Sequence, residues 1–229
     1  MVLALQAIPA ALYHDRYVAD ADAVLPHYIP DQQRAHTPLS HVFLPGIFRV
    51  RAAKVTTGLL NFARQERYEF VELDLNQSIL QALDLVVYQL QSKGIRLVRH
   101  FADDLPRFVG SLEHLKSVWI NLLVNAGDAV KDRPENSEIV ITTRLSPNGE
   151  QIQVLVQDNG VGMSEAQQAH IFEPFYTTKD PGKGTGLGLA TCFRIIEQHG
   201  GEIDVISQPG EGTTFIILLP TKEPRSENI

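Results

Sequence analysis

The chain has 229 residues, and hydrophobic types make up 44% of them, so it can bury a core of ordinary size without disulfide or metal staples. Twenty basic against 27 acidic residues give a net charge of −7, which argues against a nucleic-acid binder with a basic surplus on one face. The one cysteine, Cys192, indicates a reducing, cytoplasmic compartment, and no run approaches the roughly 20 apolar residues that cross a bilayer, so no membrane segment is expected.

Residues 1–69 are predicted to form a helical region of their own. Prolines divide the first 46 residues and disfavour long helices, although a short helix over about Ala10–Leu25 is expected. From Ile47 to about Glu69, apolar residues recur at spacings of three and four, which predicts one amphipathic helix. The arginines on its other face are interpreted as a solvated surface.

Residues 70–220 are predicted to form a compact domain of mixed helices and strands, followed by a flexible polar tail over 221–229. The expected strands are Phe70–Leu73, Ile95–Phe101, Glu138–Leu145, Gln151–Gln157, Glu202–Ser207 and Thr214–Leu219. The expected helices are one capped by Asn76 and ending near Leu90, one from Ser111 to Val130, a short one opened by a capping box of Ser164 and Gln167, and one from Leu187 to His199. Pro147–Gly149 predicts a hairpin turn between the third and fourth strands.

Five short blocks follow one another in a fixed order within 95 positions. They are Asn121–Ala126, Asp158–Gly162, Ile171–Phe175, Gly184–Leu189 and Gly210–Phe215. Each block alone fits an ordinary turn or core helix. Together they predict one adenine-nucleotide site, made of a metal ligand, an adenine acceptor and a phosphate cradle.

Asn121 and Asn125 are four positions apart in a predicted helix, so both side chains lie on one face. On an otherwise apolar helix, two asparagines also fit hydrogen-bonded core residues. Beside a nucleotide, however, an asparagine carbonyl is a hard oxygen ligand suited to Mg²⁺, which keeps most of its waters and bridges to phosphates.

Asp158 directly follows a predicted strand, and its carboxylate can accept a hydrogen bond from the exocyclic amine of adenine. Guanine carries a carbonyl at that point, so two acceptors would face each other and the wrong base would be rejected. Gly160 and Gly162 fit positions where the backbone passes close to the base or takes a positive φ.

The segment Tyr176–Gly188 carries four glycines together with Lys179 and Lys183, and it opens onto a predicted helix. Free amides and the helix dipole favour an anion there, and the glycines would let the segment close as a lid. A flexible surface loop is the simpler alternative. The chain lacks a Gly-x-x-x-x-Gly-Lys-Ser/Thr run and a strand leading into Gly-x-Gly-x-x-Gly, so two other phosphate loops are excluded.

The five blocks resemble the nucleotide-binding boxes of the catalytic domain of two-component sensor histidine kinases. These kinases belong to a superfamily that also holds gyrase, MutL and the ninety-kilodalton heat-shock chaperone. The resemblance covers about Asp74–Pro220, and Ile171–Lys179 is specific to the kinase branch. It implies an α+β fold, a two-layer sandwich whose mixed sheet has helices on one face. It also implies that Asn125 holds Mg²⁺, Asp158 binds the adenine of ATP, and Thr213 supports the base through water. The remaining cofactor-binding positions are Asp128, Gly160, Gly162, Lys179, Lys183, Gly184, Thr185, Gly186, Leu187 and Gly188.

Asn121 separates a kinase from a hydrolase. The ATPases of this superfamily place a glutamate four residues before the metal asparagine, as the base for the attacking water. The amide of Asn121 takes no proton at neutral pH, so water activation is missing. The sequence therefore predicts a domain that holds ATP for another acceptor.

The resemblance does not extend to the motif that carries the phosphoacceptor histidine. Ile47–Glu69 resembles the second helix of the family's dimerisation hairpin, but no exact acceptor motif precedes it. His14, followed by an acidic residue, is the first candidate, and His36 in His36-Thr37-Pro38-Leu39 is the second. The broken motif favours a chain without a working acceptor of its own.

Three functional hypotheses follow from this resemblance. The first is a histidine kinase core that dimerises through its N-terminal helices and passes phosphate to a response regulator receiver domain. The second is an ATP-binding regulatory module whose hairpin has degenerated. The third, a serine kinase resembling anti-sigma factors, is disfavoured by the Ile171–Phe175 block and by the hairpin-like helix.

Overall fold

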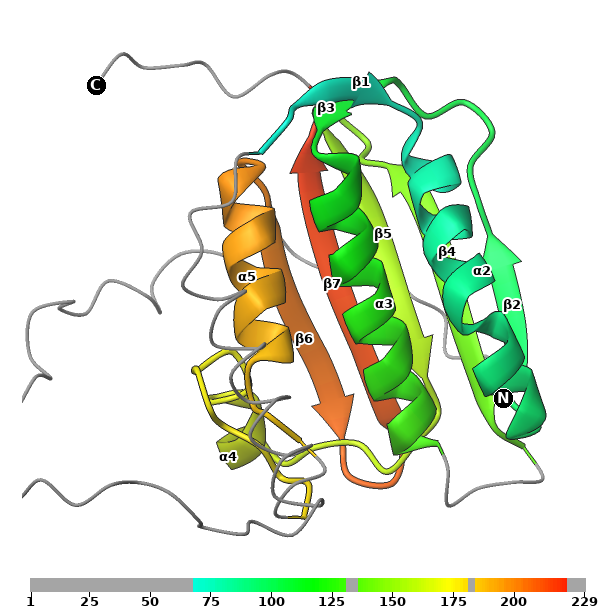
Figure 1. The fold of residues 1–229 in the computed structure, drawn as a ribbon, viewed down its shortest axis with the longest axis vertical. Helices are drawn as coiled ribbons and strands as arrows, with labels where there is room; N and C mark the ends of the chain where they lie inside the picture. The colour runs from blue at the N-terminus through cyan, green and yellow to red at the C-terminus, as the bar shows by residue number, and fades with distance from the viewer. Residues whose placement is uncertain (1–67, 131–135, 181–183, 222–229) are drawn as a thin grey trace, which may run out of the picture. The chain divides into compact units, whose positions relative to one another are not determined.

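The computed structural model describes residues 68–130, 136–180 and 184–221 (Figure 1). The predictions for residues 1–67, including the helical hairpin with His14 and His36, lie outside the described residues. The same holds for Lys183 and for the tail beyond Thr221.

One mixed sheet of five strands forms the base of the domain. Its spatial order is β2 (Arg96–His100), β4 (Glu138–Leu145), β5 (Gln151–Asp158), β7 (Gly212–Pro220) and β6 (Glu202–Gln208). β2 runs parallel to β4, and the other neighbouring pairs are antiparallel. β1 (Val71–Leu73) and β3 (Phe108–Gly110) pair as a separate antiparallel sheet.

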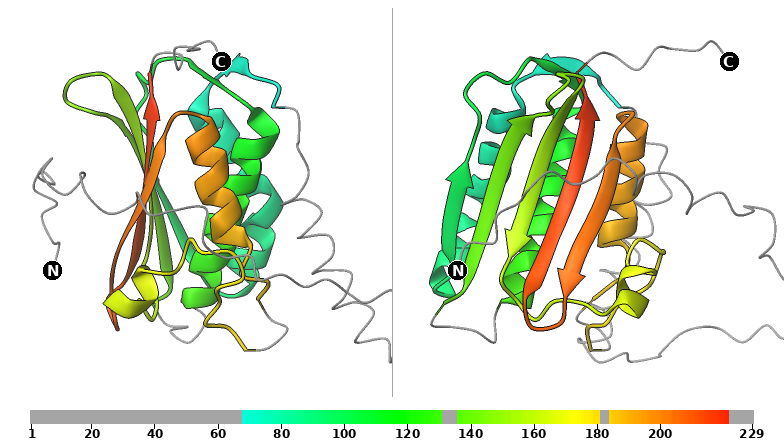
Figure 2. Two further views of the ribbon diagram at one scale, coloured as in Figure 1. Left: turned by 90° about the vertical axis from the view of Figure 1, so that its left-hand side faces the viewer. Right: turned by 180° about the vertical axis from the view of Figure 1, so that it is seen from behind.

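The helices α2 (Leu75–Ser92), α3 (Leu112–Ala129) and α5 (Gly188–Gln198) cover one face of the five-stranded sheet, as both views in Figure 2 show. The core lies between these layers, since alternate residues of the central strands, such as Ile152 and Val154 on β5, are fully buried. Trp119 on α3 is 1% exposed, and its indole donates to the Ser78 hydroxyl on α2 at 3.0 Å. The predicted two-layer α+β fold is confirmed.

Most predicted elements are present, but one local prediction was wrong and one short strand was not predicted. Asp74, rather than Asn76, caps α2, because the Asp74 carboxylate accepts from the amide of Gln77 at 3.1 Å. The Asn76 side chain instead ties α2 to the sheet: it donates to the Ala102 carbonyl and accepts from the Thr143 hydroxyl, both at 2.8 Å. Strand β3 was not predicted, since three residues give no measurable periodicity.

Other local predictions are confirmed. Ser111 is the N-cap residue of α3, and Ser164 and Gln167 form the capping box of the short helix α4 (Glu165–Gln168). The β4–β5 hairpin turns at Gly149, which has φ +72°. In the part of the chain that the structure describes, no helix combines the length and apolarity needed to span a bilayer.

Candidate nucleotide site

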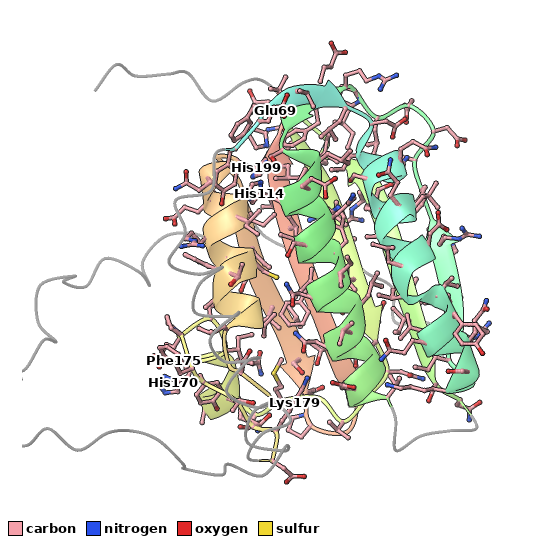
Figure 3. The ribbon with its side chains drawn as sticks, viewed as in Figure 1. Glu69, His114, His170, Phe175, Lys179 and His199 are labelled. Atoms are coloured by element: carbon pink, nitrogen blue, oxygen red, sulfur yellow. The ribbon has the colours of Figure 1, made fainter. Side chains whose placement is uncertain are left out.

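The five sequence blocks meet at one end of the domain, here called the nucleotide end. There β5 and α3 terminate, β6 turns into β7, and α5 begins (Figure 1). Figure 3 shows Phe175 and Lys179 at this end, and His114 and His199 at the opposite end. Blocks that are distant in sequence therefore contribute to one site.

Asp158 is the last residue of β5 and is only 4% exposed. In the sheet register it lies between Ile139 of β4 and Thr213 of β7. One carboxylate oxygen accepts from the Gly160 amide at 2.8 Å, and the backbone of Thr213 donates as well. Burial raises the pKa of Asp158 to about 6 against the effect of these hydrogen bonds. At neutral pH the group is a buried carboxylate with acceptor capacity to spare, which suits the exocyclic amine of adenine.

Close backbone contacts explain the two glycines after Asp158. A Cβ on Gly160 would lie 2.5 Å from the carbonyl oxygen of Ala129, at the end of α3. Gly162 has φ +66°, and a Cβ there would lie 1.8 Å from the carbonyl oxygen of Gln208. The turn is thus wedged between α3 and the β6–β7 turn, which fixes the position of Asp158.

Ser207, which the sequence did not single out, joins this turn to the β6–β7 strands. Its hydroxyl accepts from the Met163 amide and donates to the Gly212 carbonyl, both at 2.8 Å. It also lies 3.0 Å from the hydroxyl of Thr213, which is 5% exposed. Its only sequence signal is a polar residue at the end of a predicted strand, one of many such positions.

Asn121 and Asn125 lie four positions apart on α3, the helix that the sequence predicted for them, and both are half-buried. The Asn121 amide donates to the Ser117 carbonyl at 3.0 Å, and a Cβ on Gly188 would lie 3.1 Å from the Asn121 side-chain oxygen. Asn121 therefore lies beside the first residue of α5. Its amide is neutral there and cannot act as a general base.

Asn125 and Asp128 both contact Lys179. The Lys179 ammonium donates to the Asn125 side-chain oxygen at 3.1 Å and to a carboxylate oxygen of Asp128 at 2.8 Å. Lys93, at the C-cap of α2, lies 3.6 Å from the other Asp128 oxygen. Burial acts to raise the pKa of Asp128, but the hydrogen bonds and charges of Lys179 and Lys93 outweigh it and lower that pKa. Lys93 was not predicted as part of the site.

The Ile171–Phe175 block contacts the glycine-rich segment near its C-terminal end. The Phe175 amide donates to the Gly186 carbonyl at 2.8 Å, and a Cβ on Gly186 would lie 2.3 Å from the Phe175 carbonyl carbon. Phe175 itself has φ +69°. Gly184, Thr185 and Leu187 then lead into α5, where the Thr185 hydroxyl accepts from the Leu187 amide at 3.4 Å. Leu187 is buried, so it packs the start of α5 onto the core.

Comparison with known proteins gives the family. Residues 110–223 match the model of the histidine kinase-, DNA gyrase B- and HSP90-like ATPases. The crystallised catalytic domain of histidine kinase ThkA is 32% identical, with a TM-score of 0.58, and the match covers 98% of that domain and 67% of this chain. The chain belongs to the histidine kinase family. The matched residues identify the catalytic and ATP-binding domain of this family.

Curated histidine kinases match over a longer stretch of the chain. Sporulation kinase E of Bacillus subtilis is 33% identical over 177 residues, and the sensor histidine kinase ZraS of Escherichia coli is 36% identical over 177 residues. Each match covers 77% of this chain, but only 23% and 37% of the two relatives. The chain thus spans well under half the length of these full-length kinases.

Proposed function

We propose that the chain is the core of an ATP-dependent protein histidine kinase, which transfers the γ-phosphate of Mg-ATP to a histidine for relay to a response regulator. The main observation is that Asp158 is a buried carboxylate and that Asn121 is an amide. A buried carboxylate selects adenine, while an amide stands where the related ATPases have their catalytic base. Such a site binds ATP but supplies no general base that would activate a water molecule to hydrolyse it.

The residues present fit a divalent cation. The Asn125 and Asp128 oxygens already accept from one cation, the Lys179 ammonium, and hard oxygens are the ligands that Mg²⁺ prefers. When bound, Mg²⁺ would neutralise phosphate charge. Asn125 is the proposed ligand, Thr213 the proposed support of the base, and the glycine-rich segment opening onto α5 the proposed phosphate cradle.

The kinase hypothesis is supported over the regulatory-module hypothesis. Both the full-length relatives named above and ThkA are called kinases, which supports the kinase hypothesis. ThkA has also been crystallised with the response regulator TrrA, and that kinase is 28% identical to this chain with a TM-score of 0.62. By analogy, we propose a receiver domain as partner, dimerisation through residues 1–69, and action in the cytoplasm.

Phosphate labelling tests this proposal. The chain is incubated with γ-labelled ATP, and the label should be lost in acid and survive base, as a phosphohistidine does. Asp158→Asn should abolish labelling, and His14→Gln should abolish it if His14 is the acceptor in the same chain. A chain that binds nucleotide but stays unlabelled, alone and with a separate hairpin domain, would refute the kinase hypothesis. Label that persists in both His14→Gln and His36→Gln would reject both candidate acceptors.

A further inference from the structure

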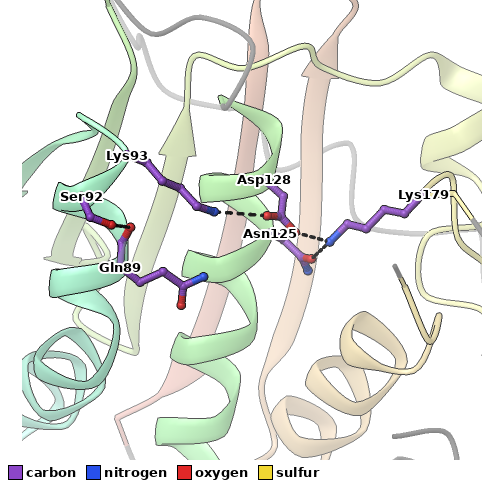
Figure 4. A network of polar contacts seen from close by, with 6 residues as sticks. All are labelled: Gln89, Ser92, Lys93, Asn125, Asp128 and Lys179. Carbon is purple, nitrogen blue, oxygen red and sulfur yellow. Dashed lines mark hydrogen bonds and ion pairs between the residues drawn. The ribbon is translucent and has the colours of Figure 1, made fainter. Parts of the chain in front are cut away.

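Lys179 sits where the proposed metal site has its protein oxygens. Figure 4 shows its ammonium reaching from the segment after Phe175 across to Asn125 and Asp128 on α3. The two contacts, at 3.1 and 2.8 Å, are of hydrogen-bonding length, and the second is also an ion pair. A single amino group therefore contacts both oxygens at once.

The spacing on α3 makes this possible. Asn125 and Asp128 are three positions apart, so their side chains share one face of the helix. An amide oxygen and a carboxylate oxygen side by side form a small hard-oxygen site for a cation. An ammonium ion donates hydrogen bonds to such oxygens and Mg²⁺ coordinates them, so the two cations compete for the Asn125 oxygen if Asn125 is the metal ligand.

Lys93 gives Asp128 a second partner. It approaches the carboxylate from α2, on the side away from Lys179, at 3.6 Å (Figure 4). If the Lys179 ammonium moves away, the Lys93 ammonium still lies near the Asp128 carboxylate and compensates its negative charge. Asp128 therefore tolerates both arrangements, with Lys179 present or withdrawn.

We propose that Lys179 is an internal cation that occupies the Asn125 and Asp128 oxygens as long as no metal is bound, and that Mg²⁺ displaces it. The inference rests on the proposed function, because it takes Asn125 as the metal ligand. In this arrangement Lys179 is a positioning residue. It holds the segment Thr177–Asp180 against α3 until the metal arrives, and its withdrawal frees that segment and places a positive charge beside the incoming phosphates.

Magnesium titration of the ADP-loaded chain tests the competition. In Lys179→Met, which keeps the aliphatic stem and removes the charge, the affinity for Mg²⁺ measured by calorimetry should rise about fivefold, the size expected from losing one partly exposed, charge-assisted hydrogen bond. Hydrogen exchange of the amides of 176–180, measured without nucleotide or metal, should be faster in this variant than in wild type.

Lys93→Met is the matched control, because it removes the same charge from the same carboxylate but leaves Asn125 untouched. A general electrostatic effect would raise the Mg²⁺ affinity in both variants. The proposal predicts no rise for Lys93→Met, since Asp128 then depends more strongly on Lys179. An equal rise in both variants, or no rise in Lys179→Met, overturns the inference.

The two proposals fail in different ways. If wild type binds no ADP, the proposed function is wrong, and the hydrogen-exchange comparison still decides whether Lys179 holds the segment. If ADP binds and responds to magnesium but exchange is unchanged in Lys179→Met, the internal-cation proposal is wrong and the kinase proposal stands. Thermal unfolding of each variant checks that the domain remains folded.

Discussion

The raised pKa of Asp158 predicts that stability and adenine affinity respond to pH in opposite directions. The folded chain binds a proton at this group with a pKa of about 6, whereas the unfolded chain does so near 3.8. Between these values the folded state holds more protons, so lowering the pH stabilises it. The proton also removes the charge from the adenine acceptor, so affinity should fall as the pH drops through about 6.

The magnitudes follow from that difference in pKa. From about pH 7.5 down to about pH 5, the Asp158 contribution should raise the free energy of unfolding by about 1.4 kcal/mol. Over the same range the fraction of ionised carboxylate falls about tenfold, so the affinity for adenosine should fall about tenfold. Adenosine is the chosen ligand because it carries no phosphate that titrates in this range.

Urea unfolding of wild type and Asp158→Asn at both pH values isolates this group, because the other titrations cancel in the difference. Wild type should gain stability relative to the variant at the lower pH. The affinity of wild type for adenosine, measured by calorimetry, should be lower there. A difference in stability that does not change with pH, or an adenosine affinity that is equal at both values, would refute the reasoning.

Two further predictions concern stability. Gly162→Ala should cost at least about 3 kcal/mol in urea unfolding, because it combines a positive φ with a contact to the Gln208 carbonyl. Gly149→Ala, at φ +72° with nothing within 4 Å, should cost only about 1 kcal/mol, and equal costs would contradict this. His199 is 1% exposed, accepts from the Ser111 amide at 2.9 Å, and has a pKa that burial lowers from 6.5. Below about pH 6.5 the unfolded chain therefore binds more protons at His199 than the folded chain does. Wild type should lose stability relative to His199→Gln as the pH falls. Parallel pH–stability curves for the two proteins would contradict this prediction.

The sequence by itself determined most of the helices and strands, though not β3, and the order of the site blocks. The capping box at Ser164, the turn at Gly149 and the shared face of Asn121 and Asn125 depend on residues within four positions of one another. Helix and strand periodicities are likewise local, so they can be counted along the chain. The family resemblance added the two-layer arrangement, which the comparisons and the structure confirm.

Only the tertiary structure decided which side chains meet and how they are charged. Lys179 and Asn125 are 54 positions apart, and Ser207 and Met163 are 44 apart, so no local pattern reports either contact. The role of Asn76 was mispredicted for the same reason, because its side chain binds Ala102 and Thr143 across the domain, whereas the cap that Asp74 forms is local. The pKa of Asp158 is likewise a tertiary property, since the neighbouring strands bury its carboxylate. Burial and long-range contacts are set by packing, which periodicity along the chain does not encode.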